Sequence, residues 1–266
     1  VSNVARSVQN RYLNVQGNVY ISGSTDHDRV LLAPILRFTG TGNQTLTGAH
    51  STTGTYRVDT LFEVNKPSGT LTVDGVLGLM QQFIVTSGAM NYNPGATFYN
   101  LNEGTSAIRL NLGLTSQTLP NLLVKGQFSH STPLYVENLT ISGSGALQAL
   151  NTGDRIYVKR DLAYSGSKRT PASTFVFDGS GYAQNISITH GSNSTTDTLR
   201  FEGGNTVNLT ATGGFASLNL SNMTTLSTNS STSMSVSGGI TVGCGSTFNQ
   251  NSASISGAIN VLPCTP

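Results

Sequence analysis

The sequence predicts an all-β fold, a parallel β-solenoid (β-helix), from three observations. Short runs that alternate apolar and polar residues recur along the chain and end at Gly, Asn or Asp-Gly, as half-buried strands do. No apolar pattern of helical period continues for more than a turn or two. Similar segments recur 19 to 25 residues apart, which is about the length of one solenoid coil.

The strands are expected wherever a short alternating run stands between turn residues. In chain order, clear examples are Leu71-Thr72-Val73, Leu139-Thr140-Ile141, Leu218-Asn219-Leu220 and Met234-Ser235-Val236. Because successive side chains of a strand point to opposite faces, the Leu, Ile, Val and Phe of these runs would fill the inside of each coil. Asn, Ser, Thr and Gly would occupy the corners and the outer faces.

Internal repetition favours a solenoid over antiparallel sheets. The matched pairs are Thr45–Gly48 with Thr70–Val73, Phe177–Gly179 with Phe201–Gly203, and Ser233–Ile240 with Ser252–Ile259. At roughly 22 residues per coil the chain would form about 12 coils, a rod on the order of 60 Å long at the spacing of parallel strands. A single elongated domain, residues 1–266, is therefore expected. The alternative is a pair of tandem β-sandwiches with a boundary near residues 165–170.

Composition agrees with many short strands joined by tight turns. Of the 266 residues only 10% are charged, against about 25% in ordinary soluble domains, and 30 are Gly. Disorder usually accompanies a high net charge, whereas this chain carries only +2. No basic stripe is present, so nucleic acid is not an expected partner. No run of 18 apolar residues occurs, so no transmembrane segment is expected.

The two cysteines, Cys244 and Cys264, are predicted to form a disulfide. Residues one coil apart in a solenoid lie about 4.8 Å from each other, and a disulfide needs Cα atoms about 4.4–6.8 Å apart. A separation of 20 residues therefore suits a covalent link between neighbouring coils near the C-terminus. Such a link is typical of an oxidising compartment.

The segment 203–266 contains no Asp, Glu, Lys, Arg or His. Soluble surfaces normally carry interspersed charges, and solenoid ends use charge to prevent growth from edge to edge. We therefore expect these uncharged C-terminal coils to be a surface for self-association or for neighbouring domains of the same protein.

Two groups of charged residues are candidate sites. Asp178 and Glu202 hold equivalent places in matched segments, so they would stack about 5 Å apart if those segments are adjacent coils. That separation suits a retaining glycosidase or a Ca²⁺ site, and it equally suits an exposed pair relieved by Arg200. The second group is the basic patch Arg155, Lys159, Arg160, Lys168 and Arg169, which suits an anionic polysaccharide or a neighbouring subunit and equally suits a solvated excursion from the solenoid.

Other chemical motifs are scarce. No nucleophile elbow of the form G-x-S-x-G and no phosphate-binding Gly-Lys motif occurs, so neither a catalytic residue nor a cofactor is expected. The pattern N-x-[ST] is frequent, as the composition alone predicts. It begins at Asn43, Asn138, Asn185, Asn193, Asn208, Asn219, Asn222 and Asn229.

A recurring segment resembles the repeats of large secreted bacterial surface proteins. In it, a Phe is followed by alternating glycines, a Gln or Asn, and then a strand. It reads Phe38-Thr39-Gly40-Thr41-Gly42-Asn43-Gln44 and returns as Phe177-Asp178-Gly179-Ser180-Gly181-Tyr182-Ala183-Gln184. The pattern is similar to that of adhesin-like proteins exported by Bacteroidetes-type bacteria and, more loosely, to filamentous-haemagglutinin-type adhesins. The resemblance implies a fibrous, surface-exposed protein with a structural role and no catalytic residues.

The sequence thus favours a secreted, cell-surface structural or adhesive module that is not an enzyme and that could assemble into filaments. One alternative is a glycan-binding or glycan-cleaving β-helix of the tailspike or lyase type, which needs clustered acids and aromatic residues in a cleft. A second alternative is an ice-binding solenoid, which needs a regular threonine ladder. Thr45/Thr47 and Thr70/Thr72 supply only two steps of such a ladder.

Overall fold

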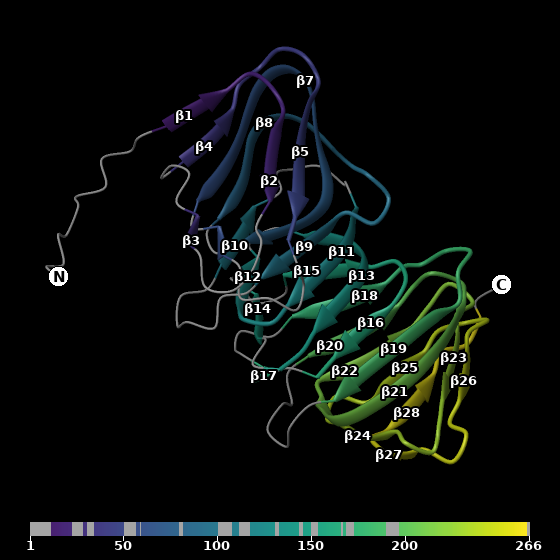
Figure 1. Ribbon diagram of the computed structural model, residues 1–266. Coiled ribbons are helices and arrows are strands. Elements are labelled where there is room, and N and C mark those ends of the chain that lie inside the picture. The colour runs from purple at the N-terminus through teal and green to yellow at the C-terminus, as the bar shows by residue number, and fades with distance from the viewer. Residues whose placement is uncertain are drawn as a thin grey trace, which may run out of the picture.

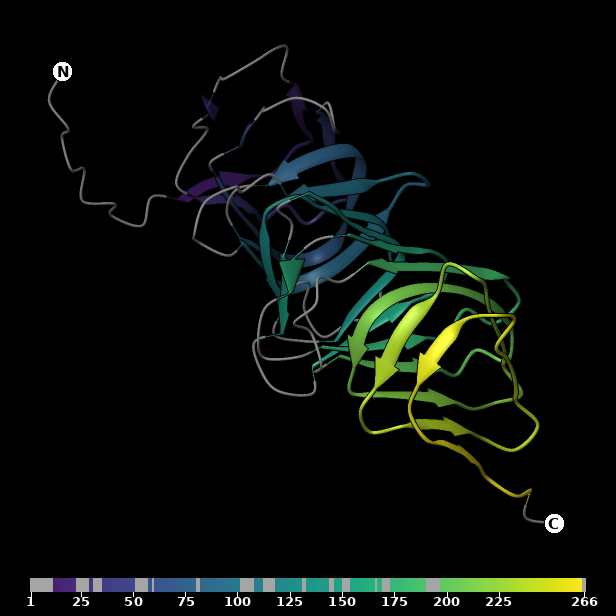
Figure 2. The same cartoon turned by 90° about the horizontal axis from the view of Figure 1, so that it is seen from below.

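The protein is a parallel β-solenoid whose first and last described coils lie at opposite ends (Figures 1 and 2). The computed structural model describes residues 12–22, 29–30, 35–50, 57–58, 60–79, 82–100, 108–111, 118–130, 133–143, 146–149, 154–165, 167–168, 173–189 and 197–264. Within these ranges there are 28 strands and no helix, and every strand pairing is parallel. The solenoid prediction is confirmed, and the tandem β-sandwich alternative, which requires antiparallel pairs, is wrong.

The strands form ladders in which each member pairs with the next coil. The first ladder contains β1 (Tyr12–Val15), β4 (Ile35–Phe38), β7 (Leu61–Leu79), β8 (Phe83–Tyr92), β10 (Ile108–Asn111), β12 (Gln127–His130), β14 (Ala146–Ala149) and β17 (Ser167–Lys168). The second contains β9 (Thr97–Asn100), β11 (Leu119–Val124), β13 (Leu134–Ile141), β16 (Leu162–Tyr164), β19 (Gln184–Thr189), β21 (Thr206–Phe215), β23 (Thr225–Thr228) and β26 (Thr247–Asn249).

A third ladder and three short ones complete the coils. The third starts from the first half of β13 and continues through β15 (Arg155–Val158), β18 (Thr174–Phe177), β20 (Thr198–Phe201), β22 (Ser217–Leu220), β25 (Ile240–Val242) and β28 (Ile259–Val261). The short ladders join β2 (Val19–Ser22) and β5 (Gln44–Ala49) to β7, β24 (Ser233–Val236) and β27 (Ser254–Ser256) to β21, and β3 (Arg29–Val30) to β6 (Arg57–Val58).

The first ladder has eight strands, which correspond to about eight turns, and the second has eleven, because it extends back from β9 through β7 and β5 to β2. The prediction of about 12 coils assumed one unbroken ladder of equal coils from end to end. The first ladder stops at β17, whereas the second continues from β2 to β26, so its eleven levels come close to the predicted number. The number of residues per coil varies along the chain, as the pairs Ala49–Val76 and Asn121–Asn138 show, so one fixed spacing does not describe every coil.

The sequence matches locate the coils, but two of the three give the wrong register. Phe177 does pair with Phe201, as predicted. Thr45, however, pairs with Thr72 rather than with Thr70. In the third match Ile240 pairs with Ile259 as predicted, whereas Ser233 pairs with Ser254 and not with Ser252. The predicted threonine steps are therefore displaced by two residues.

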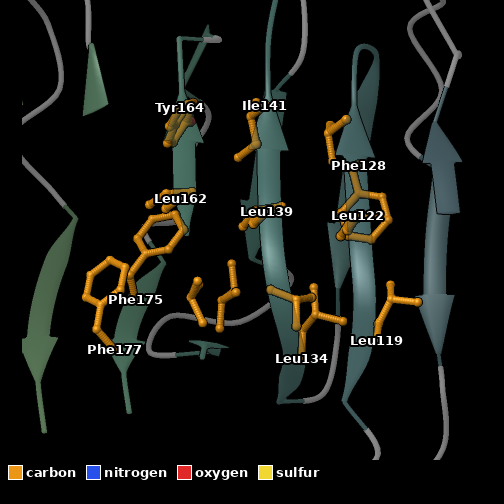
Figure 3. Close-up of a cluster of buried hydrophobic side chains, with 14 of the residues drawn as sticks. Leu119, Leu122, Phe128, Leu134, Leu139, Ile141, Leu162, Tyr164, Phe175 and Phe177 are labelled. Atoms are coloured by element: carbon orange, nitrogen blue, oxygen red, sulfur yellow. The ribbon is translucent and has the colours of Figure 1, made fainter. Parts of the chain in front are cut away.

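The core is a continuous column of buried apolar side chains inside the coils. Residues at matching positions of neighbouring strands form rows, such as Leu122, Leu139 and Leu162 (Figure 3). Aromatic rings continue the stacking, with Phe177 and Phe201 parallel at 4.9 Å between ring centroids. A fully buried side chain of this size contributes roughly 1.5–3 kcal/mol, so the rows dominate the stability of each coil.

Buried amides hold the Phe-Gly turns together. Gln184 donates from Nε2 to the carbonyl oxygens of Val158 (2.9 Å) and Arg160 (3.0 Å) in the preceding coil. Asn205, in the next coil, donates to Gln184 Oε1 at 2.9 Å. Gly179 is required here, because a Cβ would collide with the Lys159 carbonyl oxygen. In the recurring Phe-Gly-Gln pattern, the Gln side chain thus joins the turns of successive coils by hydrogen bonds.

The equivalent turn at the N-terminal end uses the same geometry. Gln44 donates to the Val15 and Gly17 carbonyl oxygens at 3.2 and 2.7 Å. The buried Lys66 caps it from the next coil: its Nζ donates to Gly40 O (2.6 Å), Gly42 O (2.8 Å) and Gln44 Oε1 (2.5 Å). Three acceptors match the three donors of an ammonium group.

Candidate functional site

One outward-facing line of residues runs along the second ladder and is rich in side-chain amides. The pairing Asn121–Asn138 continues across β16 through Asp161, which directly precedes the paired Leu162, and then through Asn185, Asn208, Ser227 and Asn249. We name this line the amide column. Its members are Asn121, Asn138, Asp161, Asn185, Asn208, Ser227 and Asn249.

Hydrogen bonds link neighbouring members of the amide column. Asn138 Nδ2 donates to Asn121 Oδ1 at 3.0 Å, and Asn208 Nδ2 donates to Asn185 Oδ1 at 3.2 Å. Asp161 Oδ1 accepts the Asn185 backbone N–H at 2.9 Å. Because an amide has two donors and an acceptor with two lone pairs, one such bond fixes its orientation and leaves capacity for a further partner.

Two depressions lie beside the amide column and share Asn138, and together we name them the lateral groove. The first has a volume of about 650 Å³ and is lined by Met90, Asn91, Tyr92, Pro94, Gly95, Thr118, Pro120, Asn121, Glu137, Asn138 and Arg160. The second has a volume of about 450 Å³ and is lined by Asn138, Leu139, Thr140, Asp161, Leu162, Ala163, Asn185, Ile186, Ser187, Asn208, Thr210 and Asn229. Amides and hydroxyls supply most of the polar lining.

The charges in the lateral groove largely neutralise one another. Arg160 Nε lies 3.7 Å from Glu137 Oε2. The Arg160 guanidinium also lies 4.5 Å from the ring centroid of Tyr182, which is 51% exposed. The turn that carries Tyr182 is fixed by Asn205, whose Nδ2 donates to the Tyr182 carbonyl oxygen at 2.8 Å. An aromatic ring therefore lies next to a groove in which Asp161 is the one charged lining residue besides the Glu137–Arg160 pair.

Three of the N-x-[ST] motifs belong to this surface. Asn138, Asn185 and Asn208 lie in the amide column, and the hydroxyl residues two positions later, Thr140, Ser187 and Thr210, line the second depression. Composition was the only explanation that the sequence suggested for these motifs. The signal that composition hides is that these motifs stack. Asn185 pairs with Asn208 and Ser187 pairs with Thr210, so Asn and hydroxyl residues recur at the same outward positions of successive strands.

Asp178 and Glu202 follow directly after the paired residues Phe177 and Phe201, so they occupy successive coils as predicted. Burial raises the pKa of Asp178, with the Glu202 charge acting in the same direction and Lys159 opposing it. Glu202 forms an ion pair with Arg200. Neither carboxylate lines the lateral groove. Within the described ranges no three His, Cys, Asp or Glu side chains are grouped closely enough to hold a metal ion.

The predicted basic patch is only partly described, and its described members have different neighbours. Arg155 donates to the Tyr157 hydroxyl at 3.4 Å. The charge of Lys159 lowers the pKa of Asp178, and Arg160 forms an ion pair with Glu137. Only the backbone of Lys168 is described, in β17, and Arg169 lies outside the described residues. Among the three members whose side chains are described, Arg160 alone lines the groove.

At the C-terminal end Cys244 and Cys264 form a disulfide with Cα atoms 4.9 Å apart. The two residues follow β25 and β28, which pair with each other, so the bond joins neighbouring coils as the spacing predicts. Close to it, the uncharged segment exposes three apolar side chains of the last coil: Ile259 (50%), Val261 (68%) and Leu262 (44%).

Comparisons with known proteins assign no relatives to the chain. No family model, no curated protein and no solved structure matches it. Throughout the part of the chain that the structure describes, no helix has the length and apolar character needed to cross a membrane.

Proposed function

We propose that the protein is an extracellular, non-catalytic adhesive module that binds through the lateral groove. The observation that carries this proposal is the part of the amide column from Asn121 to Asn208, which repeats hydrogen-bonding side chains on consecutive coils and lines both depressions. Parallel strands about 4.8 Å apart hold these side chains on a rigid scaffold. A regular, extended array of this kind suits attachment to a repetitive surface.

The position of the carboxylates supports binding rather than hydrolysis. Cleavage of a glycosidic bond by the usual mechanism needs two carboxyl groups on opposite sides of that bond. Asp178 and Glu202 lie outside the groove lining. Within the groove, Glu137 is paired with Arg160, and Asp161 accepts the Asn185 N–H. The disulfide and the low content of charged residues support an extracellular location.

Bead retention tests the proposal. Beads coated with the protein should retain extracellular polymer from a bacterial biofilm, and the polymer should release no soluble oligosaccharides during incubation. The variants Asp178→Ala and Glu202→Ala should retain as much polymer as the unmodified chain. Absence of retention would contradict the adhesive role. Release of oligosaccharides that either substitution abolishes would show that the chain is an enzyme.

A further inference from the structure

We infer that the lateral groove binds a neutral polysaccharide strand that lies along the solenoid axis. This inference rests on the proposed adhesive function and specifies its ligand. The groove extends along the axis, because its lining comes from successive coils: β8, β11, β13, the turn before β16, β19, β21 and the turn after β23. Seven levels separated by about 4.8 Å give a length of about 30 Å, which accommodates several sugar units.

The polar lining matches hydroxyl groups. Each Asn amide both donates and accepts hydrogen bonds, as does each Ser or Thr hydroxyl, and a sugar hydroxyl needs partners of both kinds. The bonds inside the column, such as Asn138 to Asn121 and Asn208 to Asn185, orient these amides before any ligand arrives. Pre-orientation reduces the entropy that is lost on binding.

The charge of the groove excludes ionic polymers. Glu137 and Arg160 compensate each other, and Asp161 is the one further charged residue in the lining. A polyanion would therefore find one arginine already paired and an unfavourable carboxylate. Nucleic acid binding depends on several Lys or Arg contacts to phosphates, which this lining lacks.

The apolar part of the first depression suits the C–H faces of sugar rings. Met90, Tyr92, Pro94 and Pro120 contribute carbon surface next to the amides of Asn91 and Asn121. Tyr182 adds a half-exposed ring that Arg160 packs against. Ligand sites typically combine such apolar walls with a few polar groups that fix orientation.

Calorimetric titration with defined oligosaccharides tests the inference. The neutral probes are cellohexaose, maltohexaose, mannohexaose and xylohexaose, each compared with its disaccharide, and the anionic probe is hexagalacturonate. We expect at least one neutral hexasaccharide to bind, with higher affinity than its disaccharide, and hexagalacturonate not to bind. Asn138→Ala and Asn185→Ala should each weaken binding about fivefold to tenfold, the equivalent of one lost hydrogen bond.

Asn249→Ala is the matched control. Asn249 belongs to the same amide column and donates to Ser227 Oγ at 3.3 Å, but it lies outside the groove lining. It should leave affinity within about twofold while removing the same kind of column contact. Circular dichroism and thermal unfolding show whether each variant remains folded, and Asn185→Ser, which retains a hydroxyl, replaces Asn185→Ala if that variant does not.

Three results would overturn the inference: no neutral hexasaccharide binds at millimolar concentration, hexagalacturonate binds equally well, or Asn249→Ala weakens binding as much as Asn138→Ala does. The bead assay separates this inference from the proposed function. Retention of biofilm polymer without hexasaccharide binding rejects the neutral-glycan ligand and leaves the adhesive role intact. Hexasaccharide binding without retention supports the ligand class and rejects the adhesive role.

Discussion

Replacing Gln184 by Met should reveal how much a buried turn amide contributes to the solenoid. Met has nearly the same length and no hydrogen-bonding amide. The substitution leaves the carbonyl oxygens of Val158 and Arg160 without their donor and Asn205 Nδ2 without its acceptor. Since a hydrogen bond contributes about 1 kcal/mol net, three lost bonds should lower the free energy of unfolding by about 3 kcal/mol.

Thermal unfolding followed by circular dichroism measures this loss. For a chain of this size about 3 kcal/mol corresponds to a Tm decrease of about 6–12 °C. Gln250→Met is the control, because Gln250 is exposed and its Nε2 bonds only to the nearby Ala253 carbonyl oxygen, at 2.9 Å. Equal Tm values for Gln184→Met and Gln250→Met would refute the claim that the amide holds successive turns together.

Three further predictions concern the disulfide, the half-buried Asp178 and the uncharged coils. Replacing Cys244 and Cys264 by Ser should lower the free energy of unfolding by about 3 kcal/mol, and alkylation without reductant should label neither cysteine of the native chain; labelling of both would exclude the bond. The pKa of Asp178 is raised in the folded state, so its ionised form is unfavourable there at pH 7. Asp178→Asn should therefore raise the Tm at pH 7, and this gain should vanish as the pH falls below 3.8, where the carboxyl is protonated in both states. A gain that is independent of pH would contradict this. If the uncharged coils self-associate, Ser235→Lys with Ser254→Lys should reduce particle size in light scattering, whereas a monomeric native chain at high concentration would reject self-association.

The sequence predicts the coil length well but the register poorly, and the physical reason is visible at β5. Shifting a strand by two residues keeps every side chain on its face, so Thr-Leu-Thr matches equally well at either position. Stacked glycines select the observed register. Gly48 pairs with Gly75, and a Cβ on either residue would collide with the backbone of the neighbouring coil.

Turns account for the second register error. Four residues, 236–239, lie between Ser235 and Ile240, whereas only Gly257 and Ala258 lie between the paired residues Ser256 and Ile259 of the next coil. Counted between these paired residues, the turn after β27 is therefore two residues shorter than the turn after β24, so Ser233 pairs with Ser254 while Ile240 pairs with Ile259. A match of two segments without gaps does not reveal such a difference in turn length.

One local feature of the sequence marks the position of the groove: the alternation of inward and outward residues is interrupted there. In β13 the buried Val136 and Leu139 enclose two successive outward residues, Glu137 and Asn138. At this point β13 stops pairing with β15 and starts pairing with β16. A single β-strand with one buried face alternates strictly, so two adjacent outward residues require the strand to turn a corner.

The preceding strand of the same ladder has the same interruption. In β11 two successive outward residues, Pro120 and Asn121, stand between the buried Leu119 and Leu122. All four outward residues of the two corners line the first depression. Corners that stack in register place an amide at both levels, Asn121 and Asn138, and the first depression lies beside them.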